Sequence, residues 1–245
     1  MADILVILAS VTVVSLVSFI GILFIGLKEA LLKRIVMALV GFASGSLIGG
    51  AFIHLLPESI EQTGQTIFYY AIAGIVFFFA MEKFLYWRHC HDGKCEVHMF
   101  AYLNLIGDGV HNFIDGITIA ASFLVSSPLG FAVTLAVVFH EIPQELGDFG
   151  VLIYSGFGKK KALTYNFICA LTAVAGSLVT YYLASSIQGV AQALIPFAAG
   201  GFIYIAATDL MPELHKRTQG KESLIQLLTI ITGIGLMYAL KILSS

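Results

Sequence analysis

Two segments about thirty residues apart place imidazole and carboxylate side chains inside long apolar runs. The first is His111-Asn112-Phe113-Ile114-Asp115-Gly116, and the second is His140-Glu141-Ile142-Pro143-Gln144-Glu145. Neutral imidazoles, carboxylates and an amide form a mixed nitrogen and oxygen ligand set that suits Zn²⁺, Fe²⁺ or Mn²⁺. Neither segment holds a thiol that would favour a softer ion. These residue types therefore predict a site for a divalent transition-metal ion.

Helical spacing would gather these side chains on shared faces. His111 and Asp115 are four residues apart, and Asp108 continues the same stripe one turn earlier. In the second segment, one line holds His140, Gln144 and Asp148, and the neighbouring line holds Glu141 and Glu145. An antiparallel helix pair would bring the two clusters to one depth, with Asp108, Glu145 and Asp148 as candidates for a secondary metal position or pathway.

The acids in this region have no basic partner nearby in the sequence. An ionised side chain at the centre of a membrane helix costs about 2.5–3.5 kcal/mol. No Lys or Arg lies between Lys94 and Lys159. The five acids inside the apolar runs, Asp108, Asp115, Glu141, Glu145 and Asp148, must therefore be neutralised by protons, by distant helices or by a cation from solution.

The composition is that of an integral membrane protein. Of the 245 residues, 58% are hydrophobic and 11% are charged, with a mean hydropathy of +0.93. An ordinary soluble domain has about 25% charged residues. The net charge of −2 gives no electrostatic case for a nucleic-acid partner, so the expected partners are a lipid bilayer and a metal ion. We expect a single transmembrane domain over residues 1–245, and we interpret the first apolar run as a retained helix.

Apolar runs long enough to cross a bilayer predict eight transmembrane helices in an all-α fold. Ser126-Ser127-Pro128 separates the fourth helix from the fifth. The predicted helices span residues 3–27, 35–56, 66–86, 99–125, 129–155, 162–186, 193–212 and 223–243.

The basic residues predict an orientation for this bundle. Twelve of the thirteen lie in the first, third, fifth and seventh loops, and only Lys241 lies near the C-terminus. The positive-inside rule then puts these loops in the cytoplasm and both termini on the extracytoplasmic side. We expect a multi-pass protein of the cell membrane.

An internal repeat indicates a 3+2+3 arrangement. Residues 42–58 align without gaps with residues 197–213, at an offset of 155, with eight identities in seventeen positions. His54 falls opposite Asp209, and both are candidates for the pathway. Helices rich in small residues also look alike for packing reasons alone, but the shared Leu-x-Pro-Glu ending favours a true repeat. We predict inverted repeats over 3–86 and 158–243, around a central pair at 99–155.

The two polar segments, completed by His140-Glu141-x-Pro143-x-Glu145-x-Gly147-Asp148, resemble the signature helices of the ZIP (Zrt/Irt-like) divalent metal transporters. The resemblance extends to His54-Leu55-x-Pro57 and to the segment from Ala199-Gly200 to Pro212-Glu213. It implies uptake of Zn²⁺, or of Fe²⁺, Mn²⁺ or Cd²⁺, into the cytosol. It also implies a metal site lined by His111, Asn112, Asp115, His140, Glu141 and Gln144.

Two positions depart from the family pattern. Many relatives have His or Glu where this chain has Gln144, and several have Cys or Glu where it has Phe139. A neutral amide is a weaker ligand than a carboxylate, so a carboxylate-bridged pair of metals is not implied. The identity of the ion stays open.

A polar cytoplasmic loop is predicted at residues 87–98. It gathers three His and two Cys within ten residues, and His89 and His91 are candidates for a secondary metal position. The spacing matches no standard zinc motif, and chance accumulation in a short polar loop is the alternative.

Two other function classes are compatible with these residues. An intramembrane zinc hydrolase would use His140-Glu141, but Gln144 stands where His-Glu-x-x-His needs its second imidazole. A proton-coupled metal exporter would need the same ligands and differs only in direction. We predict a transporter, not an enzyme, with the metal as cargo and no cofactor; a homodimer is a candidate assembly.

Overall fold

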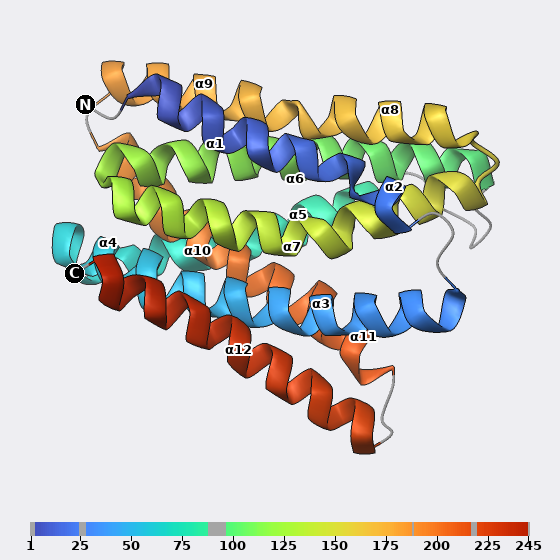
Figure 1. Ribbon diagram of the computed structural model, residues 1–245. Helices are drawn as coiled ribbons and strands as arrows, with labels where there is room; N and C mark the ends of the chain where they lie inside the picture. The colour runs from blue at the N-terminus through green and yellow to red at the C-terminus, as the bar shows by residue number, and fades with distance from the viewer. Residues whose placement is uncertain (1–2, 25–27, 88–96, 188, 217–219, 245) are drawn as a thin grey trace.

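The computed structural model describes residues 3–24, 28–87, 97–187, 189–216 and 220–244. Every regular element within these ranges is helical, and none is a strand. The helices run roughly along one direction as a bundle, and α1 begins at the same end where α12 finishes (Figure 1). The all-α prediction is confirmed.

The N-terminal third holds three long helical rods. The first is interrupted by a 3₁₀ turn at Val17–Ile20, where the sequence predicts one continuous helix. The second contains a π-helical turn at Gly50–Leu55 and continues beyond its predicted end into α4, with Pro57 as the second residue of α4. The helices are α1 Ile4–Leu16, α2 Gly21–Phe24, α3 Glu29–Gly49, α4 Leu56–Thr63 and α5 Ile67–Trp87.

The central pair consists of α6 (Val97–Val125) and α7 (Ser127–Tyr154). They are separated by Ser126, whose side chain accepts a hydrogen bond from the backbone N–H of Leu129 at 3.3 Å. This N-cap and the following Pro128 start a new helix at the predicted break. The short connection makes α6 and α7 antiparallel neighbours.

The C-terminal third repeats features of the first. A π-helical turn at Ala206–Leu210 lies between α10 and α11, with Pro212 in the first turn that follows. The predicted sixth helix is divided at Leu171. The helices are α8 Lys159–Ala170, α9 Thr172–Ser186, α10 Val190–Ile205, α11 Met211–His215 and α12 Gly220–Ser244.

Five segments of the described chain are long and apolar enough to cross a membrane. One of them, Arg34–Phe84, holds both α3 and α5, joined at Gly64, whose φ of +69° suits glycine. The 29-residue α6 and the 28-residue α7 are long enough to cross but carry the polar residues described above. The protein is a multi-pass membrane protein, and the count of eight crossings stays a prediction.

Close backbone contacts hold the helices beside the polar segments. A Cβ at Gly116 of α6 would collide with the carbonyl of Ala173 in α9, and one at Gly176 of α9 would collide with the carbonyl of Phe113. Only glycine permits this approach. These contacts fix the position of α6 against α9.

The two π-helical turns occupy corresponding places at the offset of 155 residues. Their helices also pack in corresponding ways: Gly45 of α3 lies against Ile230 of α12, and Gly200 of α10 lies against Ala71 of α5. These similarities support the inverted repeat, which remains a proposal for how the domain is divided.

Candidate metal centre

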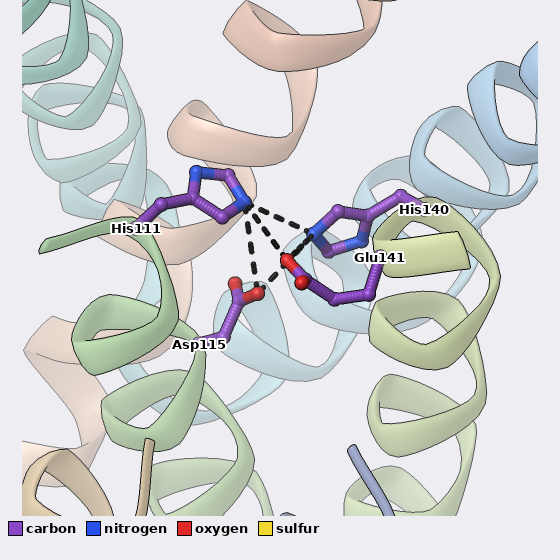
Figure 2. A group of neighbouring side chains, drawn as sticks. All are labelled: His111, Asp115, His140 and Glu141. Carbon is purple, nitrogen blue, oxygen red and sulfur yellow. Dashed lines mark hydrogen bonds and ion pairs between the residues drawn. The ribbon is translucent and has the colours of Figure 1, made fainter. Parts of the chain in front are cut away.

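Four side chains from α6 and α7 converge at the middle of the bundle. His111 and Asp115 project from α6, and His140 and Glu141 project from α7 toward them (Figure 2). One nitrogen or oxygen of each lies within 4.8 Å of the others. We call this group the tetrad. The i, i+4 spacing on α6 supplies one half, and two adjacent residues of α7 supply the other.

The separations inside the tetrad match those around a small cation. The Nε2 atoms of His111 and His140 are 3.2 Å apart. His111 Nε2 lies 3.7 Å from Asp115 Oδ2 and 3.4 Å from Glu141 Oε1. His140 Nε2 lies 3.2 Å and 3.5 Å from the same two oxygens. Tetrahedral ligands about 2.0–2.2 Å from Zn²⁺ would be roughly 3.3–3.6 Å apart.

A backbone contact sets the tautomer of His140. Its Nδ1 lies 3.1 Å from the carbonyl oxygen of Ala136. A carbonyl only accepts, so Nδ1 must carry the proton and donate. In neutral His140 the lone pair is then on Nε2, which faces the tetrad. This arrangement is the one that metal-binding histidines use.

The tetrad is buried and poor in donors. His111 is 9% exposed, Asp115 is 2%, and His140 and Glu141 are each 1%. Asp115 Oδ2 and Glu141 Oε1 have no hydrogen-bond partner. Within the described residues, the ion pairs of these two carboxylates are with the two histidines alone. Two anions facing each other without donors would be stabilised by a cation between them.

A second acid group lies next to the tetrad and shares Glu141 with it. Asp108 and Glu145 complete this group, and both are buried. Unlike the tetrad, it contains amide donors. Asn112 Nδ2 donates to Asp108 Oδ1 at 2.8 Å, and Asn166 Nδ2 of α8 donates to Glu145 Oε2 at 2.9 Å.

A cavity of about 570 Å³ opens from the tetrad toward the ends of the helices that carry the basic loops. His111, Asp108, Gln144 and Asp148 form its inner wall. The opposite wall comes from α5 and from α10 through α11, and its polar members are Glu82, Tyr204, Asp209 and Glu213. No Lys or Arg lines it among the described residues, so the carboxylates of its lining have no basic partner from Lys or Arg there.

The other side of the tetrad is filled by apolar side chains. The buried core includes Ile119 and Phe123 from α6, Val133 and Val137 from α7, and Phe202 from α10. The Phe202 ring meets the His140 ring edge-on, with centroids 6.0 Å apart. The tetrad is therefore open toward one end of the bundle and closed toward the other.

The profile of the ZIP zinc transporter family matches residues 88–241, which include the whole tetrad. The chain belongs to the ZIP family. It is 30% identical to the zinc transporter zipt-7.1 of Caenorhabditis briggsae, over 82% of this chain and 69% of that protein. It is 36% identical to ZIP13 of Pongo abelii, over 81% of this chain and 65% of that protein. The resemblance inferred from the two polar segments is confirmed.

The six residues implied as ligands by the ZIP resemblance do not all lie together. His111, Asp115, His140 and Glu141 form the tetrad. Asn112 instead donates to Asp108, with its own Oδ1 unpartnered, and Gln144 lies on the cavity wall. Whether these two amides bind the ion stays a prediction.

The secondary candidates are spread over the molecule. His54 is buried away from the tetrad, where its Nε2 donates to the carbonyl of Met237 at 2.8 Å. Asp209 lies in the cavity, and Asp148 accepts a hydrogen bond from Asn104 at 2.8 Å there. His89 and His91 lie outside the described residues, so metal binding by the 87–98 loop stays a prediction.

The sequence interpretation missed Asn166, Glu82 and Tyr204. Asn166 contacts Glu145, and the Tyr204 hydroxyl donates to Glu82 at 2.5 Å inside the cavity. All three come from helices outside the central pair. The available signal was weak: each is a polar residue in a largely apolar run.

Proposed function

We propose that this ZIP protein transports a divalent transition-metal ion across a membrane, with the tetrad as the binding site for the ion in transit. Zn²⁺ is the first choice, because two imidazoles and two carboxylates in a tetrahedral set match its preferred ligands and geometry. Fe²⁺, Mn²⁺ and Cd²⁺ are the other candidates. The observation that carries the proposal is the spacing of 3.2–3.7 Å between the buried ligand atoms of the four residues.

The acidic cavity is the proposed release route. It starts at His111 and ends near Glu213, close to the loop between α11 and α12. The charge distribution of the loops predicts that this end faces the cytoplasm, so the conformation would be open inward. An ion leaving the tetrad would pass Gln144 and Asp148 before it reaches bulk water. Import into the cytosol is the direction that fits this route.

The second acid group is proposed as a partner site for protons or for a second cation. Asp108, Glu141 and Glu145 are too close for all three to be ionised without a counterion. Because Glu141 belongs to both groups, occupancy of the tetrad changes the charge that the second group must balance. Whether the protein binds one ion or two therefore depends on how Glu141 is shared between the two groups.

A hydrolase is disfavoured by the number of ligands. A catalytic zinc keeps one position open for water, with three protein ligands. The tetrad offers four protein ligands, and apolar side chains close its far side. A transport site needs only to bind and release.

The decisive experiment is ion uptake by purified protein in liposomes. We expect Zn²⁺ uptake by the wild type and at least about a 100-fold loss for His140→Ala, since a lost ligand costs more than the 10–100-fold of a lost outer contact. Thr164→Ala, at an exposed position of α8, is the matched control and should transport normally. Equal uptake by His140→Ala and the wild type would overturn the site, and hydrolysis without uptake would favour the enzyme.

Orientation is tested separately by cysteine labelling in intact cells. In a cysteine-free background, a single cysteine replacing Gln62 of α4 should react with an impermeant maleimide added from outside. A cysteine replacing Lys160 should react only after permeabilisation. Both positions are exposed in the structure. Labelling of the Lys160 position from outside would invert the proposed orientation and the direction of release.

A further inference from the structure

A second, smaller cavity of about 310 Å³ lies between α2, α3 and α7. Its lining consists only of apolar side chains and glycines, including Leu32, Phe149 and Ile153. A Cβ at Gly147 or Gly150 would meet no atom within 4 Å, so the glycines of α7 leave this space open. A hydrated ion or a polar ligand would find no side chain there to form a hydrogen bond. A hydrocarbon chain has no hydrogen bond to lose when it enters, so the cavity suits hydrocarbon.

The cavity lies near the helix ends that carry the basic loops. Leu32 and Val36 belong to the first two turns of α3, and Ile153 belongs to the last turn of α7. In a bundle that crosses a membrane, this is the depth at which lipid head groups meet their acyl chains. A lipid chain can therefore reach the cavity without leaving the bilayer.

The end of α3 beside the cavity is positively charged. Lys28 is the N-cap of α3, and Leu32 and Val36 of the cavity lining follow it by four and eight residues. Lys28 is exposed, one turn beyond the apolar lining. Residues 28–34 hold three basic residues against one acid, Glu29. An apolar cavity below a cationic helix end is complementary to a phospholipid with an anionic head group.

The small cavity shares a wall with the metal cavity. Val36, Pro143 and Gly147 line both. Pro143 has no N–H to donate within α7, and glycine adds no packing, so this stretch of the wall has weak support of its own. Hydrocarbon in the small cavity would contact the outer side of the wall that borders the ion.

We propose that the small cavity binds an acyl chain of an anionic membrane phospholipid, with the head group against Lys28, and that its occupancy supports the α7 wall of the metal cavity. The lipid site rests on the fold and on the charge of α3. It does not depend on which ion the tetrad binds.

Lipid binding is measured directly by native mass spectrometry of the full chain in mild detergent, with phosphatidylglycerol or phosphatidylcholine added. The wild type should retain phosphatidylglycerol in preference to phosphatidylcholine. Gly150→Leu fills the cavity and should abolish that preference, and Lys28→Gln should weaken it about fivefold, the equivalent of one surface cation. Gly235→Leu, at an exposed glycine of α12 with open space around it, and Lys160→Gln are the matched controls and should bind like the wild type.

Several outcomes would overturn the proposal. Equal retention of the two lipids by the wild type would remove the head-group preference. Equal losses in Lys28→Gln and Lys160→Gln would mean diffuse attraction to a charged surface. Equal binding by Gly150→Leu and Gly235→Leu would mean that the cavity is not the site. Where Gly150→Leu does not fold, Ile153→Phe fills the same space from the last turn of α7 and is judged by the same criterion.

The effect on the ion is a second measurement. Phosphatidylglycerol in the liposomes should raise Zn²⁺ uptake by the wild type and by Gly235→Leu. It should leave Zn²⁺ uptake by Gly150→Leu unchanged. Stimulation of Gly150→Leu to the same extent would overturn the link between the two cavities. Because lipid binding is read without metal, a failed transport site and a failed lipid site give different results.

Discussion

The tetrad and the acid group beside it hold buried carboxylates in different surroundings. In the acid group, Asp108 and Glu145 each accept a hydrogen bond from an amide N–H, supplied by Asn112 and Asn166. In the tetrad, Asp115 and Glu141 have no amide donor, and their ion-pair partners are the Nε2 atoms of two imidazoles. Buried anions can be stabilised by fixed donors or by a mobile cation. The difference favours the tetrad as the proposed place for the ion.

The largest expected effect is a difference in Zn²⁺ affinity between two isosteric variants, one in the tetrad and one in the acid group. Glu141→Gln removes an anion from the tetrad and should weaken Zn²⁺ binding by more than about 100-fold. Glu145→Gln keeps the shape and removes a titratable carboxyl group from the acid group, so the affinity should change by less than about tenfold. Equilibrium titration of both variants measures this. Equal losses would mean that the two groups act as a single site.

An intermediate effect is expected at Gln144, which lies on the cavity wall between the tetrad and the exit. Gln144→Glu adds an anion there and should hold the ion more tightly during release. Conduction requires binding weak enough to let the ion leave, so we expect KM and the maximal rate to fall together, each several-fold. Initial uptake rates at varied Zn²⁺ measure both. If neither constant changes, Gln144 lies outside the path of the ion.

The smallest effect on the ion is expected at Asn166. Asn166→Ala leaves Glu145 Oε2 without its amide donor, which should cost about 1–3 kcal/mol of stability. Zn²⁺ affinity should stay within about threefold of the wild type, since no tetrad atom is touched. Thermal unfolding and titration of the same sample test both statements. A large loss of affinity with unchanged stability would place Asn166 among the ligands.

Much of the tetrad could be predicted from local spacing. His111 and Asp115 share a helix face, and a short connection after α6 makes the next helix antiparallel, which brings His140 and Glu141 to the same depth. The all-helical membrane class followed from composition.

The remaining details depend on contacts between distant segments. The repeat matched His54 to Asp209. In the structure, the hydrogen-bond partner of His54 is Met237 of α12, which is 183 residues away in the sequence. Asn112 belongs to the signature motif, yet its amide turns to Asp108 on the same helix. The division of the first and sixth predicted helices, and both π-helical turns, occur within apolar runs that carry no clear sequence signal.

The assignment of the tetrad is tested most directly by the atoms that surround the bound ion. X-ray absorption at the zinc edge of purified protein, loaded with one equivalent of Zn²⁺, reports this without reference to transport. We expect two imidazole nitrogens and two oxygens at about 2.0–2.2 Å, with no sulfur. The imidazole signal should be reduced in His140→Ala. A spectrum with sulfur ligands, or one unchanged by His140→Ala, would place the ion elsewhere in the chain and contradict the assignment of the tetrad.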